Sequence, residues 1–83
     1  MQWFLKAAEN GNANAQLEIG SAYAKGDGVL KDPVEAHAWC NIAGVRGEEK
    51  AQKARDSLEE KMTKEQIAEA TKRARELMRG IQI

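Results

Sequence analysis

The sequence repeats itself at a spacing of 36 residues, and this register constrains the fold more than any other feature. The segment that begins at Trp3 returns at Trp39, and the two copies share Trp, Ala, Gly, Ala and Gln in register. A period of this length is typical of stacked helical units, none of which buries its apolar face without a neighbour. The repeat therefore predicts an all-α chain of similar units, and it leaves the partner of such a chain open.

Length and composition narrow the classes of protein. The chain has 83 residues, enough for one domain, and 13 basic side chains balance 13 acidic ones. This balance gives no positive surface for nucleic acid or for an anionic membrane. No apolar stretch is long enough to cross a bilayer or to form a signal peptide, and a single cysteine implies no oxidising compartment. We expect a cytoplasmic protein with neither nucleic acid nor membrane as partner.

Five helices are predicted from apolar periodicity and from the residues that begin and end helices. Asn12 is a predicted N-cap, and Asp32 is another, followed by Pro33 at the first helical position. Glu35 is expected to complete an acidic capping box with Asp32, and Thr63 opens a second box. The predicted helices span about residues 2–10, 13–25, 33–46, 48–61 and 64–79.

Small residues dominate the faces that are predicted to be buried, which allows the helices to approach closely. Gly20 lies inside a predicted helix, where glycine costs about 1 kcal/mol relative to alanine, so we expect a neighbouring helix to cross there. Val29 or Leu30, in a glycine-rich loop, is expected to tuck into a groove between helices. Aromatic side chains are expected to fill the wedges between helix pairs. They are Trp3, Phe4, Tyr23 and Trp39.

Three segments of the sequence resemble the Sel-1-like repeat, a relative of the tetratricopeptide repeat. Residues 15–29 match its pattern A-x-x-x-L-G-x-x-Y-x-x-G-x-G-V, residues 32–39 match D-x-x-x-A-x-x-W, and residues 42–47 match its A-A-x-x-G ending. The resemblance implies an α-α superhelix, a right-handed solenoid of antiparallel helix pairs. It also implies that the first helix of each pair lines the concave surface.

The resemblance divides the chain into three parts of a single Sel-1-like repeat domain, residues 1–83. Residues 1–11 resemble the second helix of a partial repeat, and residues 12–47 resemble a complete repeat. Residues 48–83 resemble a degenerate repeat with a C-terminal capping helix, because polar residues replace the apolar signature. The replaced positions are Arg55, Asp56 and Glu59, each 36 residues after Ile19, Gly20 and Tyr23.

Catalytic, metal and cofactor sites find little support in the sequence. His37 and Cys40 lie three residues apart on one predicted helix, but two ligands are too few for structural zinc, and a nucleophile needs further partners. Cys40 is expected to be a buried, inert thiol, and His37 to lie at the edge of the helix face. We therefore predict no enzyme, no metal and no cofactor. A small enzyme or metal-binding protein is the least favoured alternative.

A stripe of polar residues on the predicted first helices is our candidate for partner binding. The stripe lies on the side of these helices away from the apolar residues, where the resemblance places the concave surface. We predict that it binds a protein or peptide, so that the chain acts as a non-enzymatic interaction or adaptor module. Its members are Asn14, Glu18, Ser21 and Lys25, with Lys50, Ser57 and Lys61 at corresponding positions one repeat later.

Self-association is the alternative function. The helix at residues 2–10 lacks the first helix against which it would normally pack, so its apolar side chains are expected to form an exposed patch. These side chains are Trp3, Phe4 and Ala7. Such a chain is expected to form a homo-oligomer, end to end or by exchange of helices, or to be the C-terminal piece of a longer repeat protein with a structural or regulatory role.

Overall fold

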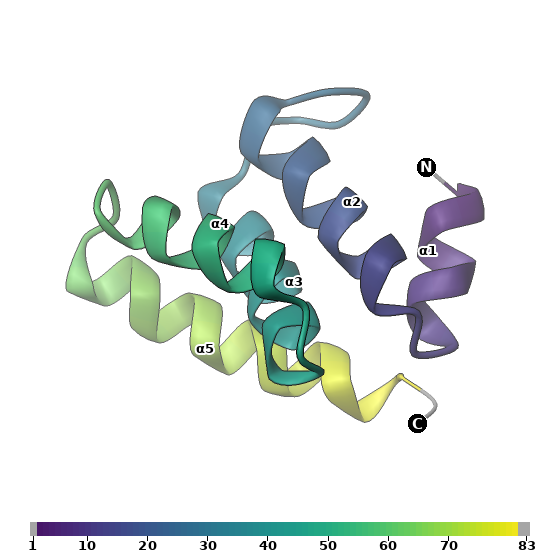
Figure 1. Ribbon diagram of the computed structural model, residues 1–83. Coiled ribbons are helices and arrows are strands. Elements are labelled where there is room, and N and C mark those ends of the chain that lie inside the picture. Colours follow the sequence, from purple (N-terminus) through teal and green to yellow (C-terminus); the bar gives the residue numbers. More distant parts are fainter. Residues whose placement is uncertain (1, 82–83) are drawn as a thin grey trace.

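The computed structural model describes residues 2–81, which form five helices and contain no strand. The helices are α1 (Gln2–Glu9), α2 (Ala13–Lys25), α3 (Pro33–Val45), α4 (Glu49–Glu59) and α5 (Lys64–Arg79), and Figure 1 shows their arrangement. The prediction of an all-α chain is confirmed, and each helix end lies within two residues of its predicted place. Consecutive helices from α1 to α4 pack against one another, as in the predicted α-α superhelix.

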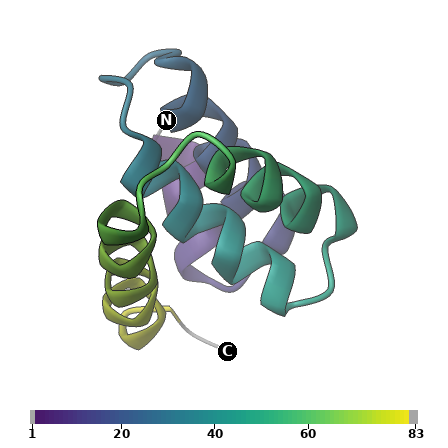
Figure 2. The same ribbon diagram turned by 90° about the vertical axis from the view of Figure 1, so that its left-hand side faces the viewer.

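The helix α3 lies at the centre of the fold. On one face it packs against α2 and α4, which also contact each other, and on a different face it packs against α5 (Figures 1 and 2). One cluster of buried side chains joins α2, α3 and α5, and includes Ile19, Trp39, Ile42 and Ala74. A second cluster joins α2, α3 and α4, and consists of Leu17, Cys40, Ala43 and Ala51. The helix α5 packs on a side of α3 that faces away from α2 and α4. It therefore does not cover the outer surface of α2 and α4.

The 36-residue register has a structural cause, because the same hydrogen bond occurs in both copies. The amide Nε2 of Gln16 donates to the carbonyl oxygen of Ala8 at 3.1 Å, and Nε2 of Gln52 donates to the carbonyl oxygen of Gly44 at 2.8 Å. Each bond ties the end of one helix to the first turns of the next. The glutamines recur in the sequence because they fix successive helix pairs in the same relative position.

The turns that precede these glutamines repeat as well. Gly11 and Gly47 have φ values of 91° and 96°, in the left-handed region where a side chain is strained. The next residue, Asn12 or Glu48, donates its N–H to a carbonyl in the last turn of the preceding helix, at 3.1 Å in both turns. Asn12 and Glu48 then cap the helix that follows, as predicted for Asn12.

Gly20 marks the expected close crossing of two helices. A Cβ atom at this position would lie 2.6 Å from Cys40 Sγ and 3.2 Å from the carbonyl oxygen of Ala36, both on α3. Real Cβ atoms do not approach another heavy atom so closely. The glycine therefore allows α2 and α3 to approach more closely than any residue with a side chain would.

The helix α3 begins at Asp32 as predicted, but the acidic capping box is wrong. Oδ1 of Asp32 accepts the N–H groups of Val34 and Glu35, at 3.0 and 3.2 Å. The N–H of Asp32, which Glu35 was expected to bind, instead donates to the carbonyl oxygen of Tyr23 at 3.0 Å. The carboxylate of Glu35 therefore binds Nε of Arg73 on α5 and fixes that helix to α3.

Two expectations about apolar side chains have different outcomes. Of Val29 and Leu30, either of which was expected to tuck into a groove, Val29 is half-buried and Leu30 is 90% exposed. Trp3 is 80% exposed and fills no wedge, whereas Trp39, its equivalent, is 3% exposed in the core. The cause lies in the neighbours, because α1 packs mainly against α2 and α3 packs against three helices.

Candidate partner-binding groove

A groove of about 290 Å³ runs between α2 and α4, and we call it the α2–α4 groove. Apolar residues, including the almost fully buried Cys40 of α3, form what we call its floor, and two serines and two lysines also line it. The helix α2 contributes Gly20, Ser21, Ala24 and Lys25, and the α4 side contributes Ala54, Ser57, Leu58 and Lys61. The short side chains of the two alanines leave the space open.

The structure brings four of the seven predicted partner-binding residues to this groove, namely Ser21, Lys25, Ser57 and Lys61. Glu18 lies instead in an adjoining hollow of about 280 Å³, which Phe4 borders and which Ser21 and Lys25 also line. Asn14 and Lys50 are exposed in the first turns of α2 and α4 and line neither space. The polar stripe is therefore longer than the groove that it borders.

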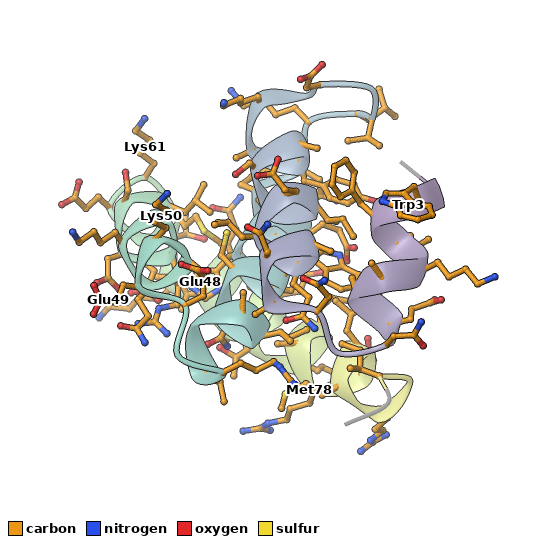
Figure 3. All side chains as sticks on the ribbon, turned by 45° about the vertical axis from the view of Figure 1, so that its right-hand side comes forward. Trp3, Glu48, Glu49, Lys50, Lys61 and Met78 are labelled. Atoms are coloured by element: carbon orange, nitrogen blue, oxygen red, sulfur yellow. The ribbon has the colours of Figure 1, made fainter. Side chains whose placement is uncertain are left out.

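The two predicted lysines of the α4 side have different surroundings. Lys50 follows Glu48, whose carboxylate accepts the backbone N–H of Lys50 at 3.3 Å. Figure 3 shows Lys50 close to Glu48, and Lys61 pointing away from the body of the molecule farther along. Lys61 lines the α2–α4 groove, whereas Lys50 does not.

The apolar floor of the groove was not predicted as part of a site. Leu58 and Ala54 belong to the apolar stripe of their helix, and the sequence offers no sign that part of this stripe stays uncovered. Both are half-buried.

His37 and Cys40 are both buried, and the placement of His37 at the edge of the helix is wrong. His37 is 1% exposed, and its Nε2 lies 2.7 Å from Oε2 of Glu59 on α4. Glu59 on α4 thus provides a partner for a buried imidazole. For Cys40 the expectation of a buried thiol is confirmed. Burial raises the pKa of this thiol to about 11, against a smaller lowering effect of Arg55.

These two side chains do not form a metal site. Among residues 2–81, no three His, Cys, Asp or Glu side chains are grouped so that they would hold a metal ion. Nor does any helix in this range have the length and apolar character needed to span a bilayer.

A second hollow, of about 330 Å³, lies between α1, α3 and α5, and three of the charged side chains that line it are paired with one another. Arg73 binds Glu35, and its Nη1 lies 3.6 Å from Oε1 of Glu76. The hydrogen bond to Glu35 is the main reason that the pKa of Arg73 is raised. These side chains link α5 to α3 and are not free to bind a ligand.

The apolar patch predicted on α1 is present in part. Trp3 and Phe4 are exposed, as is Leu5, which was not predicted. Ala7 is half-buried and packs against the main core cluster. Trp3 and Ala7 border a shallow hollow of about 200 Å³, whereas Phe4 faces the hollow beside α2. The three predicted residues therefore do not form one continuous surface.

Comparison with known families gives one match. Two segments of the chain, residues 1–12 and 13–44, match the Sel1 repeat, and together they cover more than half of the sequence. No curated protein matches the chain.

Proposed function

Since this chain belongs to the Sel1 repeat family, we propose that it is a non-enzymatic adaptor module that binds a partner protein or peptide in the α2–α4 groove. Sel1 repeats are generally protein–protein interaction modules. The observation that carries the proposal is the groove itself, in which an apolar floor is bordered by hydroxyl and ammonium groups. An apolar centre with a polar rim is the usual anatomy of a protein interface.

The packing of the helices also favours the α2–α4 groove as the binding surface. The helix α5 packs against α3, and the glutamine hydrogen bonds fix α1 to α2 and α3 to α4. Two rigid helices thus form the walls of the groove, so a ligand loses little affinity to ordering of the protein. In this proposal α2 and α3 are the complete repeat, α1 belongs to a partial one, and α4 and α5 are a degenerate repeat with its cap.

The absence of catalysis is part of the proposal. Members of this family are typically non-enzymatic. A cysteine nucleophile reacts as the thiolate, and burial keeps the Cys40 thiol protonated at neutral pH. His37 is held against Glu59 in the interior, away from the solvent that a substrate would cross.

The test uses peptides selected from a random library against the folded chain. Ser57→Trp fills the α2–α4 groove, and Lys53→Trp places the same side chain on an exposed part of α4 outside it. We expect Ser57→Trp to weaken the selected peptides by about tenfold or more and Lys53→Trp by less than about twofold, measured by fluorescence anisotropy. Circular dichroism confirms that both variants fold. Equal affinity for the wild type and the Ser57→Trp variant would overturn the proposal.

A second candidate function, self-association through α1, is favoured by one observation. Trp3 is 80% exposed, and Phe4 and Leu5 beside it are exposed as well. Large aromatic side chains in such a position are typical of interfaces. We expect Trp3→Glu to shift the chain toward the monomer in sedimentation velocity at micromolar concentration. Leu30→Glu, which changes an equally exposed apolar side chain in the loop, is the control and leaves the sedimentation unchanged. A wild-type chain that stays monomeric would remove this candidate.

A further inference from the structure

The charged side chains that line the α2–α4 groove are all positive. Two lysines line it and no carboxylate does. On α4, Asp56 lies 3.4 Å from Arg55 and Glu59 lies 2.7 Å from His37, and the exposed Glu60 before Lys61 does not line the groove. Among residues 2–81, neither Lys25 nor Lys61 forms an ion pair.

The other side of Lys25 is different. Glu18 and Asp27 line the adjoining hollow beside α1, together with Lys25 itself. A negative ligand would be repelled there and attracted on the side of α4. The local charges thus single out the α2–α4 groove, although the net charge of the whole chain is zero.

The polar groups of the groove occur in two equivalent sets. Ser21 precedes Lys25 by four residues, and Ser57 precedes Lys61 by four residues, 36 positions later. Residues four apart lie on the same face of a helix, so in α2 Ser21 lies one turn from Lys25, whereas Lys61 follows Ser57 in the turn after α4. Both lysines lie at the C-terminal end of their helix, Lys25 as the last residue of α2 and Lys61 just beyond α4. The groove therefore presents two similar donor sets side by side.

The usual distance between two packed helices indicates how far apart the charges of the ligand should be. Packed helices lie about 8–10 Å apart, and an extended chain rises about 3.3 Å per residue. Two carboxylates that are two or three positions apart in a peptide match this separation. The groove, at about 290 Å³, is slightly smaller than the range of about 300–1,000 Å³ for small-molecule sites, and has room for one or two side chains.

We propose, as a refinement that rests on the proposed function, that the α2–α4 groove binds an extended acidic peptide segment. Its two carboxylates, two or three positions apart, accept hydrogen bonds from Lys25 and Lys61 and from the serine of each set. An apolar side chain between the two acidic residues lies on the floor beside Leu58. The partner is thus a protein with an acidic segment of this spacing.

A structural role for the lysines is the competing explanation. A cation near the C-terminus of a helix interacts favourably with the free carbonyl groups and the helix dipole. Such a role would lower the midpoint of thermal unfolding when a lysine is replaced, and would leave peptide affinity unchanged. Affinity and thermal stability are therefore measured on the same variants.

The probe is a short peptide with blocked termini that contains two glutamates separated by two residues, one of which is leucine. Its counterpart carries glutamine at both positions. Isothermal titration calorimetry is done with the wild type, with Lys25→Gln, Lys61→Gln and the double variant, and with Lys50→Gln/Lys53→Gln. The last variant has the same change in net charge, but its residues lie on α4 outside the groove.

We expect the glutamate peptide to bind the wild type more tightly than the glutamine peptide, with an affinity that falls as salt is added. Each single groove variant is expected to weaken it about threefold, and the double variant about tenfold. The Lys50→Gln/Lys53→Gln control is expected to stay within about twofold. Equal binding of the two peptides, or an equal loss in the control variant, would overturn the proposal.

The experiment separates this refinement from the proposed function. If neutral peptides from the library lose affinity in the Ser57→Trp variant while the glutamate peptide fails to bind, the acidic ligand is wrong and the groove remains the binding surface. If Ser57→Trp changes the affinity of no peptide, the proposed function fails and the refinement fails with it.

Discussion

The helices α1 and α3 occupy equivalent positions in the 36-residue repeat, yet their surroundings are opposite. Trp39 of α3 is 3% exposed among three neighbouring helices, while Trp3 of α1 is 80% exposed. The local structure of the two helices is nonetheless the same, down to the glycine turn and the hydrogen bond from the following glutamine. Motif residues thus determine the helix and its ends, whereas the number of neighbours determines which side chains are buried.

The largest expected difference between the two copies is in the contribution of their tryptophans to stability. Trp39→Ala should lower the free energy of unfolding by about 3–5 kcal/mol, because it removes a large buried side chain and leaves a cavity. Trp3→Ala should change it by less than about 0.5 kcal/mol, because the side chain is mostly in solvent. Urea denaturation followed by circular dichroism measures both. Similar losses in the two variants would mean that α1 is covered in solution.

The next comparison concerns Cys40 and its equivalent, Phe4. Burial raises the pKa of the Cys40 thiol from 9.0 to about 11. Between these values the unfolded chain loses the thiol proton and the folded chain keeps it, so stability falls as pH rises from 9 to 11. The thiol should account for a loss of about 2 kcal/mol at pH 11, which Cys40→Ala removes. The measurement is urea denaturation of both proteins at pH 9 and pH 11.

The reactivity of the thiol can also be compared at the two equivalent positions, by moving the cysteine from position 40 to position 4. The Phe4→Cys/Cys40→Ala variant carries the thiol on the exposed side of α1. It should react rapidly with a thiol reagent at pH 8, whereas the native Cys40 should react only when the chain unfolds. Equal rates would contradict the burial of Cys40.

A smaller difference in stability is expected between alanine substitutions at two helical glycines, Gly20 and Gly44. Gly20→Ala should destabilise the fold by about 1–3 kcal/mol, since the new Cβ would lie 2.6 Å from Cys40 Sγ and near the backbone of α3. Gly44→Ala should change stability by less than about 1 kcal/mol, because the clash of its Cβ with Cγ of Gln52 at 2.9 Å is offset by the higher helix propensity of alanine, and the backbone of Gln52 lies at an ordinary contact distance of 3.5 Å. The first copy supports this expectation, because alanine already stands there as Ala8. Gly80→Ala, with no close neighbour, is the control. A large loss for Gly44→Ala would show that the two copies are not equivalent.

The last comparison concerns the repeated glutamine hydrogen bond, for which we expect a modest effect. Gln52→Ala should lower the free energy of unfolding by about 0.5–1.5 kcal/mol through the lost bond to Gly44. Gln16→Ala should cost more, because Gln16 is fully buried and its truncation also leaves a cavity. Both are measured by urea denaturation. No loss in either variant would mean that these bonds do not hold the helix pairs together.

Much of the fold was predictable from the sequence because its signals are local. Asn12, Asp32 and Thr63 cap helices as predicted, Gly26 ends α2 in the left-handed conformation, and Gly20 marks a helix crossing. Each of these residues acts on backbone groups within a few positions or at a single close contact. Such effects depend little on the rest of the chain.

The features that were predicted wrongly depend on residues far apart in the sequence. Glu35 binds Arg73, which lies 38 positions away, and so does not complete its local capping box. His37 is buried because Glu59 reaches it from α4. The position of the α2–α4 groove likewise depends on which side of α3 the helix α5 covers. No periodicity within one helix contains this information.

Two surfaces of the molecule compete as the binding site for the partner, the α2–α4 groove and the exposed side of α1. The direct measurement is a two-dimensional ¹⁵N–¹H NMR titration with a selected peptide, which reports on the backbone of both surfaces in one experiment. We predict that the largest shift changes occur at Ser21, Lys25, Ser57 and Lys61. Changes confined to α1, around Trp3 and Lys6, would contradict the assignment of the groove as the binding surface.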